Sequence, residues 1–193
     1  MTTADPYHYL RNPADAGPWA EARTLRDLGE LTARWLEGSI NYQPAWESAR
    51  PDAETERLVP VLADLNRRGF VTHFSQPGAS SGADHLRAVV SGFGTEALIS
   101  RLEAAALGTD LVVLAYQPGG GLDGHQIPIA TADGEACRWA GAAMSADTIT
   151  GFYGEDCPHA VASLRDAWQA TVIDPHWGRN DLLWERLRAA VGA

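Results

Sequence analysis

Apolar side chains recur at helical spacing in several stretches of the chain. One face of residues 21–37 carries Leu25, Leu28, Leu31, Trp35 and Leu36, and Gly38 follows as a helix end. The same spacing predicts helices over residues 52–68, 95–106, 160–167 and 181–191. Pro60 leaves two alternatives for the first of these, because it either lies near the first turn of one helix or starts a second, shorter helix.

Short apolar runs between these helices predict strands. They cover residues 70–75, 111–116 and 170–173, and residues 85–93 contain a further strand. Residues 126–131 and 135–141 predict a hairpin, because Asp133-Gly134 favours a tight turn between two strands. Helices in both halves with hairpins between them predict an α+β domain with a mixed β-sheet and packed helices. We expect a flexible N-terminal arm over residues 1–18 and a single domain over residues 19–193.

Composition narrows the class of protein. The chain has 193 residues, 45% of them hydrophobic, which is enough for a substantial core. A net charge of −10 without a basic run argues against nucleic acid as a partner. All 15 basic residues are arginines, so Schiff-base lysine chemistry and lysine-dependent phosphate loops are excluded.

The two cysteines, Cys137 and Cys157, lack CxxC spacing and favour a reduced, cytoplasmic protein. The N-terminus shows no secretory signal, and no stretch is long and apolar enough for a membrane span. We therefore expect a cytoplasmic protein without a membrane partner.

The helix over residues 52–68, the turn at Gly69 and the strand over residues 70–75 predict a small polar pocket. The helix is roughly 22 Å long and the returning strand roughly 17 to 20 Å, so Ser75 should end close to Glu54 and Thr55. Strict alternation, however, puts Thr72 and Ser75 on opposite faces. Either the strand bulges, or it ends at Phe74 and Ser75 turns back with Gln76-Pro77.

These residues also allow a purely structural interpretation. Thr72 would then be an ordinary strand residue, and Ser75 would cap a turn. Glu54 would be a solvated acid in the first helical turn, favoured there by the helix dipole.

Three motifs in this stretch carry a resemblance to a known family. They are Ala53-Glu54-Thr55, the turn Asn66-Arg67-Arg68-Gly69 and the strand Thr72-His73-Phe74-Ser75-Gln76-Pro77. In type and spacing they resemble the C-terminal regulatory domain of eukaryotic-type methylenetetrahydrofolate reductase, which binds S-adenosylmethionine and S-adenosylhomocysteine. Residues 28–38, 136–139 and 172–184 extend the similarity over most of residues 20–191. The chain also resembles uncharacterised actinobacterial domains.

The resemblance implies an adenosyl ligand without a metal. It assigns ligand contacts to Glu54, Thr55, Thr72 and Ser75. Two later threonines of the family map less well, one onto Arg138, which precedes Trp139, and the other near Thr148 or Thr150. The catalytic barrel of the reductase has no counterpart here, so the resemblance implies no reductase activity.

The residue types suit such a ligand. A carboxylate such as Glu54 can pair with the ligand ammonium, and threonine and serine hydroxyls can bind ribose or the amino-acid end. Tryptophan faces can stack adenine or attract the sulfonium.

Other apparent motifs lack the context that their chemistry needs. Residues 119–124 match the pattern G-x-G-x-x-G. A dinucleotide site requires a helix directly after this pattern, and the sequence that follows, His125-Gln126-Ile127-Pro128, cannot begin one. No GxSxG elbow surrounds Ser75 or Ser91, and the histidines show no HExxH pair. His73 is the one histidine beside the predicted pocket, where it is a candidate acid or base or else a structural histidine.

Three functional hypotheses follow from the sequence. The first is a stand-alone binding protein for S-adenosylmethionine or S-adenosylhomocysteine, such as a sensor that reports to a protein partner. The second is an enzyme that consumes the ligand by lyase or alkyl-transfer chemistry, with Glu54 or His73 as the base. The third is an acidic interaction or immunity-type protein that binds no ligand.

Overall fold

The computed structural model describes residues 13–46, 50–121 and 124–192, which form an α+β fold. Its helices are α1 (Pro13–Ala20), α2 (Leu25–Leu36), α3 (Val59–Arg67), α4 (Glu96–Ala106), α5 (Ala146–Tyr153), α6 (Val161–Arg165) and α7 (Leu182–Gly192), with 3-10 turns η1 (Pro44–Trp46) and η2 (Ala53–Leu58). Its strands are β1 (Val71–Gln76), β2 (Ala79–Ser81), β3 (Asp84–Leu86), β4 (Val89–Gly94), β5 (Val112–Tyr116), β6 (Ile127–Ala132), β7 (Glu135–Ala140) and β8 (Trp168–Ile173).

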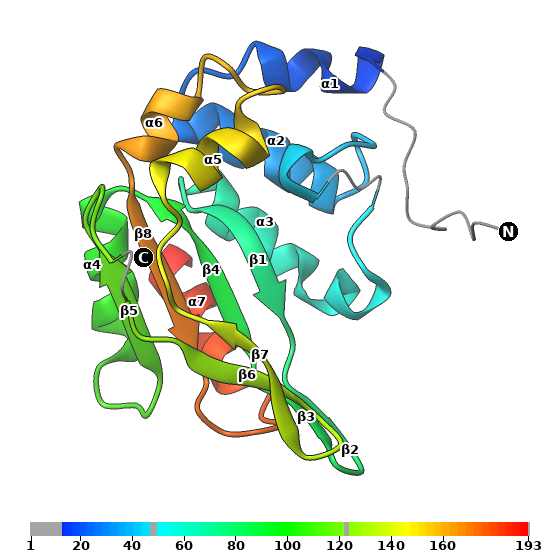
Figure 1. The fold of residues 1–193 in the computed structure, drawn as a ribbon, viewed down its shortest axis with the longest axis vertical. Helices are drawn as coiled ribbons and strands as arrows, with labels where there is room; N and C mark the ends of the chain where they lie inside the picture. The colour runs from blue at the N-terminus through cyan, green and yellow to red at the C-terminus, as the bar shows by residue number, and fades with distance from the viewer. Residues whose placement is uncertain (1–12, 47–49, 122–123, 193) are drawn as a thin grey trace, which may run out of the picture.

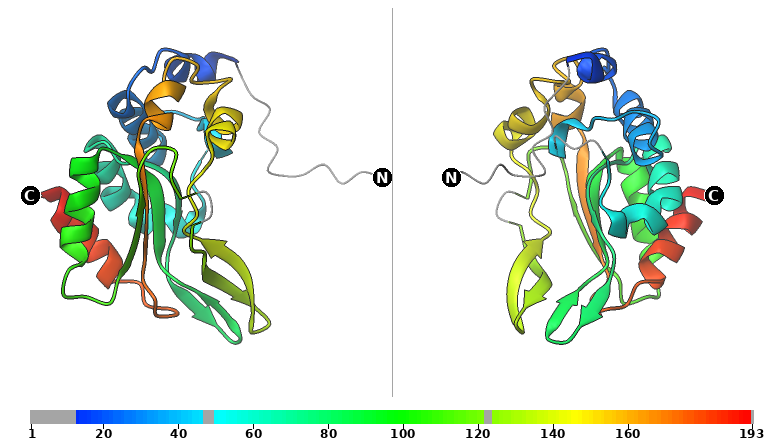
Figure 2. Two further views of the ribbon diagram at one scale, coloured as in Figure 1. Left: turned by 60° about the vertical axis from the view of Figure 1, so that its left-hand side comes forward. Right: turned by 90° about the vertical axis from the view of Figure 1, so that its right-hand side faces the viewer.

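The strands form two antiparallel sheets. The main sheet has the order β1-β4-β8-β5, so that β1 is an edge strand, and the second sheet has the order β2-β3-β6-β7. Helices α3, α4 and α7 lie on one face of the main sheet, whereas α5, α6 and the β6–β7 hairpin lie on the other side (Figures 1 and 2). We call these the helix face and the hairpin face.

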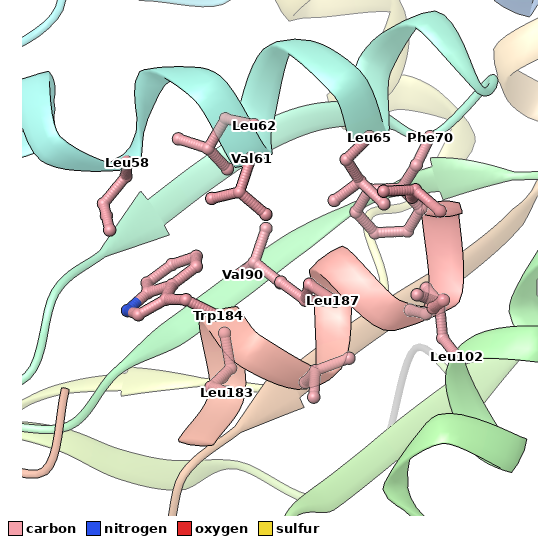
Figure 3. Close-up of a cluster of buried hydrophobic side chains, with 14 of the residues drawn as sticks. Leu58, Val61, Leu62, Leu65, Phe70, Val90, Leu102, Leu183, Trp184 and Leu187 are labelled. Carbon is pink, nitrogen blue, oxygen red and sulfur yellow. The ribbon is translucent and has the colours of Figure 1, made fainter. Parts of the chain in front are cut away.

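A large apolar cluster fills the helix face. Val90 from β4 lies among leucines of α3 and the side chains of Trp184 and Leu187 from α7 (Figure 3). Gly92 on the same strand leaves room for the ring of Phe70, because a Cβ atom at this glycine would lie 2.6 Å from that ring. Burial of this cluster joins α3, α4 and α7 to the sheet.

A second cluster lies under α5 and α6 on the hairpin face. It joins Val71 and Phe93 from the sheet to Ile149 and Tyr153 from α5. A third, smaller cluster of Val89, Ile129 and Ile173 joins the two sheets. Alternate residues of β4 therefore belong to different cores, as period-two alternation requires.

Most predicted elements are confirmed, as is the α+β class. The hairpin turn has positive φ at both Asp133 (51°) and Gly134 (83°), as Asp-Gly turns require. The mixed sheet expected from the sequence is instead two antiparallel sheets.

The predicted helix over residues 52–68 is divided into η2 and α3, and Pro60 lies in the first turn of α3. Pro60 therefore starts the second of two helical segments. The predicted N-terminal arm lies mostly outside the described residues, but its last part, from Pro13, belongs to α1. Among the described residues, no helix has the length and apolar character needed to cross a membrane.

Candidate functional site

The predicted site residues near the start of the motif lie on η2, which packs against β1 and α3. Glu54 is exposed in the first turn of η2, and Thr55 is buried beneath it. Among the described residues, neither side chain has a hydrogen-bond partner. The Glu54 carboxylate is therefore open to solvent, whereas the Thr55 hydroxyl is buried and unpaired among those residues.

A β-bulge in β1 decides how Thr72 and Ser75 point. The register shifts between Thr72 and Phe74, so Thr72 lies opposite Gly92 while Ser75 lies opposite Val90. Gly92 and Val90 are two residues apart on β4 and share the helix face. The bulge thus places Thr72 and Ser75 on the same face, although strict alternation would have separated them.

Thr72 is fixed by the turn that precedes the strand. The Nδ2 of Asn66 donates to Thr72 Oγ1 (2.9 Å), and the Thr72 backbone N–H donates to Asn66 Oδ1 (3.0 Å). Asn66 is fully buried and also donates to the Leu62 carbonyl (2.8 Å). The Thr72 hydroxyl therefore has a structural partner and retains its own proton for a further bond.

Gln76 ends β1 with its side chain buried on the hairpin face, opposite Val89. Its Nε2 donates to the carbonyls of Arg87 and Ile129, both at 3.0 Å. Its Oε1 accepts from Nη1 of Arg138 on β7, at 3.1 Å. Arg138 is therefore held at the end of β1, one residue beyond Ser75.

The remaining predicted residues lie on the hairpin side of the main sheet. Trp139 is 49% exposed on β7. Thr148 and Thr150 are exposed on α5, where the Ser145 side chain bonds Thr148 and Thr150 donates to the Ala146 carbonyl (2.8 Å). Thr72 and Ser75 thus face the helix side of β1, and Glu54 and Thr55 lie on η2, which contacts this strand. Of the other four residues, only Arg138 is bonded to β1.

His73 is at the bulge and points to the hairpin face. Its ring centroid lies 5.5 Å from that of Phe93, which in turn makes an edge contact with Tyr153 at 6.3 Å. Desolvation lowers the pKa of His73 to about 4, so the imidazole is neutral near pH 7. His73 faces away from Glu54, and the two candidate bases do not form one catalytic pair.

The same core holds two weak acids whose pKa is raised by burial. Burial raises the pKa of the Cys157 thiol to about 12, and it also raises the pKa of the Tyr153 hydroxyl above its ordinary value. The Tyr153 hydroxyl has no hydrogen-bond partner in the part of the chain that the structure describes. Neither group forms its anion near neutral pH, so neither is an activated nucleophile.

The glycine-rich segment serves as a loop, as the sequence predicted. The described part of this segment leads into β6 and not into a helix. Gly121 lies against the ring of Tyr116, and Gly124 lies beside its hydroxyl. Leu122 and Asp123 of this segment lie outside the described residues. Among the residues that the structure describes, no group of three metal-ligating side chains converges.

Two residues of the site were not singled out by sequence reasoning. Asn66 and Gln76 are both inside the motifs, yet their roles depend on partners that local patterns do not show. Gln76 meets Arg138 across 62 positions of the chain.

Comparison with known protein families identifies the family of this chain. The chain belongs to a family described as a domain of unknown function (DUF6919), whose model matches residues 14–193. The match covers the whole of both sheets and the helices packed on them. Glu54, Thr55, Thr72, Ser75 and Arg138 are all within the matched region.

Proposed function

We propose that this member of the family binds S-adenosylmethionine or S-adenosylhomocysteine at the η2–β1 edge. In this proposal the protein acts as a sensor that reports methyl-donor status to a protein partner. Glu54, Thr55, Thr72 and Ser75 supply the contacts on the helix side. The protein acts in the cytoplasm, in keeping with two cysteines that form no disulfide.

The bulge in β1 is the observation that carries this proposal. Without it, Thr72 and Ser75 would point to opposite faces, and one ligand could not contact both from the side of η2. With it, the side chains of Thr72 and Ser75 share the helix face of β1, and η2, which carries Thr55, contacts this strand. β-bulges are common next to binding sites, where they change the direction of a side chain.

Charge supports a cationic ligand. The chain carries a net charge of −10, and Glu54 is an exposed acid that pairs with no described arginine. A sulfonium compound with an ammonium group would be attracted by the field of the whole protein. The ammonium would form a charge-assisted bond with Glu54.

The experiment that tests this proposal is titration calorimetry with S-adenosylmethionine and S-adenosylhomocysteine. We expect saturable one-to-one binding of at least one of them, and adenosine alone serves as the control for the adenine and ribose contacts. Mass spectrometry of the ligand after prolonged incubation then separates a binding protein from an enzyme. An intact ligand agrees with the sensor, whereas the absence of binding at millimolar ligand would overturn the proposal.

A further inference from the structure

Gln76 is a buried amide whose orientation is set by its neighbours. It is 2% exposed, and its Nε2 group donates to two backbone carbonyls, those of Arg87 and Ile129. An amide nitrogen has two N–H groups, so both are used. Its Oε1 must then point toward β7, where it accepts from Arg138.

Arg138 is consequently held by a neutral acceptor and not by an acid. Its bond to Gln76 Oε1 (3.1 Å) is the hydrogen bond that it forms among the described residues, and no described carboxylate pairs with it. A guanidinium has five N–H donors, so most of them remain available.

Three other arginines of the fold are held by carboxylates, an aromatic ring or a backbone carbonyl. Arg67 forms bonds of 2.7 Å to both carboxylate oxygens of Glu37, and Arg179 bonds Asp174 at 2.6 Å. Arg87, on the other side of Gln76, is stacked 3.9 Å over the ring of Trp177 and donates to the Pro128 carbonyl at 2.6 Å. Arg138 is exposed, and it differs from exposed arginines such as Arg101 in that a buried amide, Gln76, holds its guanidinium.

We infer that Arg138 is an anion-binding residue that receives the carboxylate of the ligand. The inference rests on the proposed function and adds the group that binds the acidic end of the amino-acid moiety. The planar guanidinium matches a carboxylate in a bidentate bond, and Gln76 holds it in place before the ligand arrives. Ser75 directly precedes Gln76 at the free edge of β1, so one ligand crossing this edge can contact both Ser75 and Arg138.

The test compares two ligands that differ only in this carboxylate. Calorimetry is carried out with S-adenosylmethionine and with decarboxylated S-adenosylmethionine, which keeps the ammonium, the sulfonium and the nucleoside. We expect Arg138→Gln to weaken binding of the carboxylated ligand at least tenfold and to leave binding of the decarboxylated ligand within twofold of wild type. Arg138→Lys, which keeps the charge without the planar fork, should recover only part of the loss.

Arg101→Gln is the matched control, because Arg101 is an exposed arginine on α4, on the other face of the main sheet. It should bind both ligands as the wild type does. Equal weakening of the two ligands by Arg138→Gln would overturn the inference, since it would show that Arg138 merely supports Gln76. No effect on either ligand would overturn it as well, while the proposed function would stand. If the wild type binds neither ligand, the proposed function fails and this inference fails with it.

Discussion

Asn66 and Thr72 are joined by two hydrogen bonds, one in each direction. The Asn66 amide donates to the Thr72 hydroxyl, and the Thr72 backbone N–H donates back to the amide oxygen. This pair fixes the end of α3 to the start of β1, and it sets the direction of the Thr72 hydroxyl. Because Thr72 Oγ1 accepts one bond from Asn66, its hydroxyl keeps its proton and one lone pair for a ligand atom.

Loss of the Asn66 side chain should therefore destabilise the fold. Asn66→Ala removes three hydrogen bonds at a fully buried position and leaves the Thr72 N–H without its acceptor, at a cost of about 3 kcal/mol. Thr72→Val removes one acceptor and should cost about 1 kcal/mol. Urea denaturation of both single variants and the double variant gives the coupling energy. Strictly additive effects would contradict the pairing.

Gly29 on α2 is in close contact with this same turn. A Cβ atom at Gly29 would lie 2.2 Å from the Asn66 carbonyl oxygen, whereas Gly151 on α5 has nothing within 4 Å of its Cβ position. Gly29→Ala should lower the free energy of unfolding by about 2 kcal/mol or more, because backbone must move. Gly151→Ala should raise it by about 0.5 to 1 kcal/mol through helix propensity. Thermal denaturation distinguishes the two, and a stabilised Gly29→Ala would show that α2 is not tightly packed here.

Features that depend on neighbouring residues were accessible from the sequence. The Asp133-Gly134 turn and the C-terminal end of α2 at Gly38 both need positive φ, which glycine permits, and both are confirmed. Helix α5 was missed even though its N-cap was visible in the sequence. Ser145 caps this helix by accepting from the Thr148 N–H, but only Ile149 and Tyr153 of α5 are buried, so its apolar pattern is short.

Features that depend on distant residues were not accessible. The division into two sheets follows from the pairing of Leu86 with Ala130, which are far apart in the chain. The bulge at His73 carries no glycine to mark it, and the sequence left it as one of two alternatives. The sequence around Arg138 does not show which side chain binds its guanidinium, because its partner Gln76 is on another sheet.

The buried imidazole of His73 should make stability depend on pH. Its pKa is about 4 in the folded protein, against about 6.5 in the unfolded chain. Between these values the unfolded chain binds a proton that the folded protein does not, so stability should fall as the pH decreases from 6.5 to 4. The loss should be on the order of 1 to 3 kcal/mol.

Urea denaturation at pH 7, 5.5 and 4.5 measures this loss for each variant. His73→Gln should reduce the fall in stability over this range, whereas the exposed His125→Gln should keep it. Identical pH profiles for His73→Gln and the wild type would show that His73 is not responsible.

Glu54 and Ser75 provide the most direct test of the binding site. We expect Glu54→Gln and Ser75→Ala each to weaken binding of S-adenosylmethionine at least tenfold, equivalent to about 1.4 kcal/mol. Glu54 would lose its charge-assisted bond to the ammonium, and Ser75 its hydroxyl at the edge of β1. Glu96→Gln is the matched control, since Glu96 is also an exposed acid in a first helical turn, at the start of α4. If binding occurs but calorimetry shows the same affinity for all three variants, the ligand binds elsewhere on the protein.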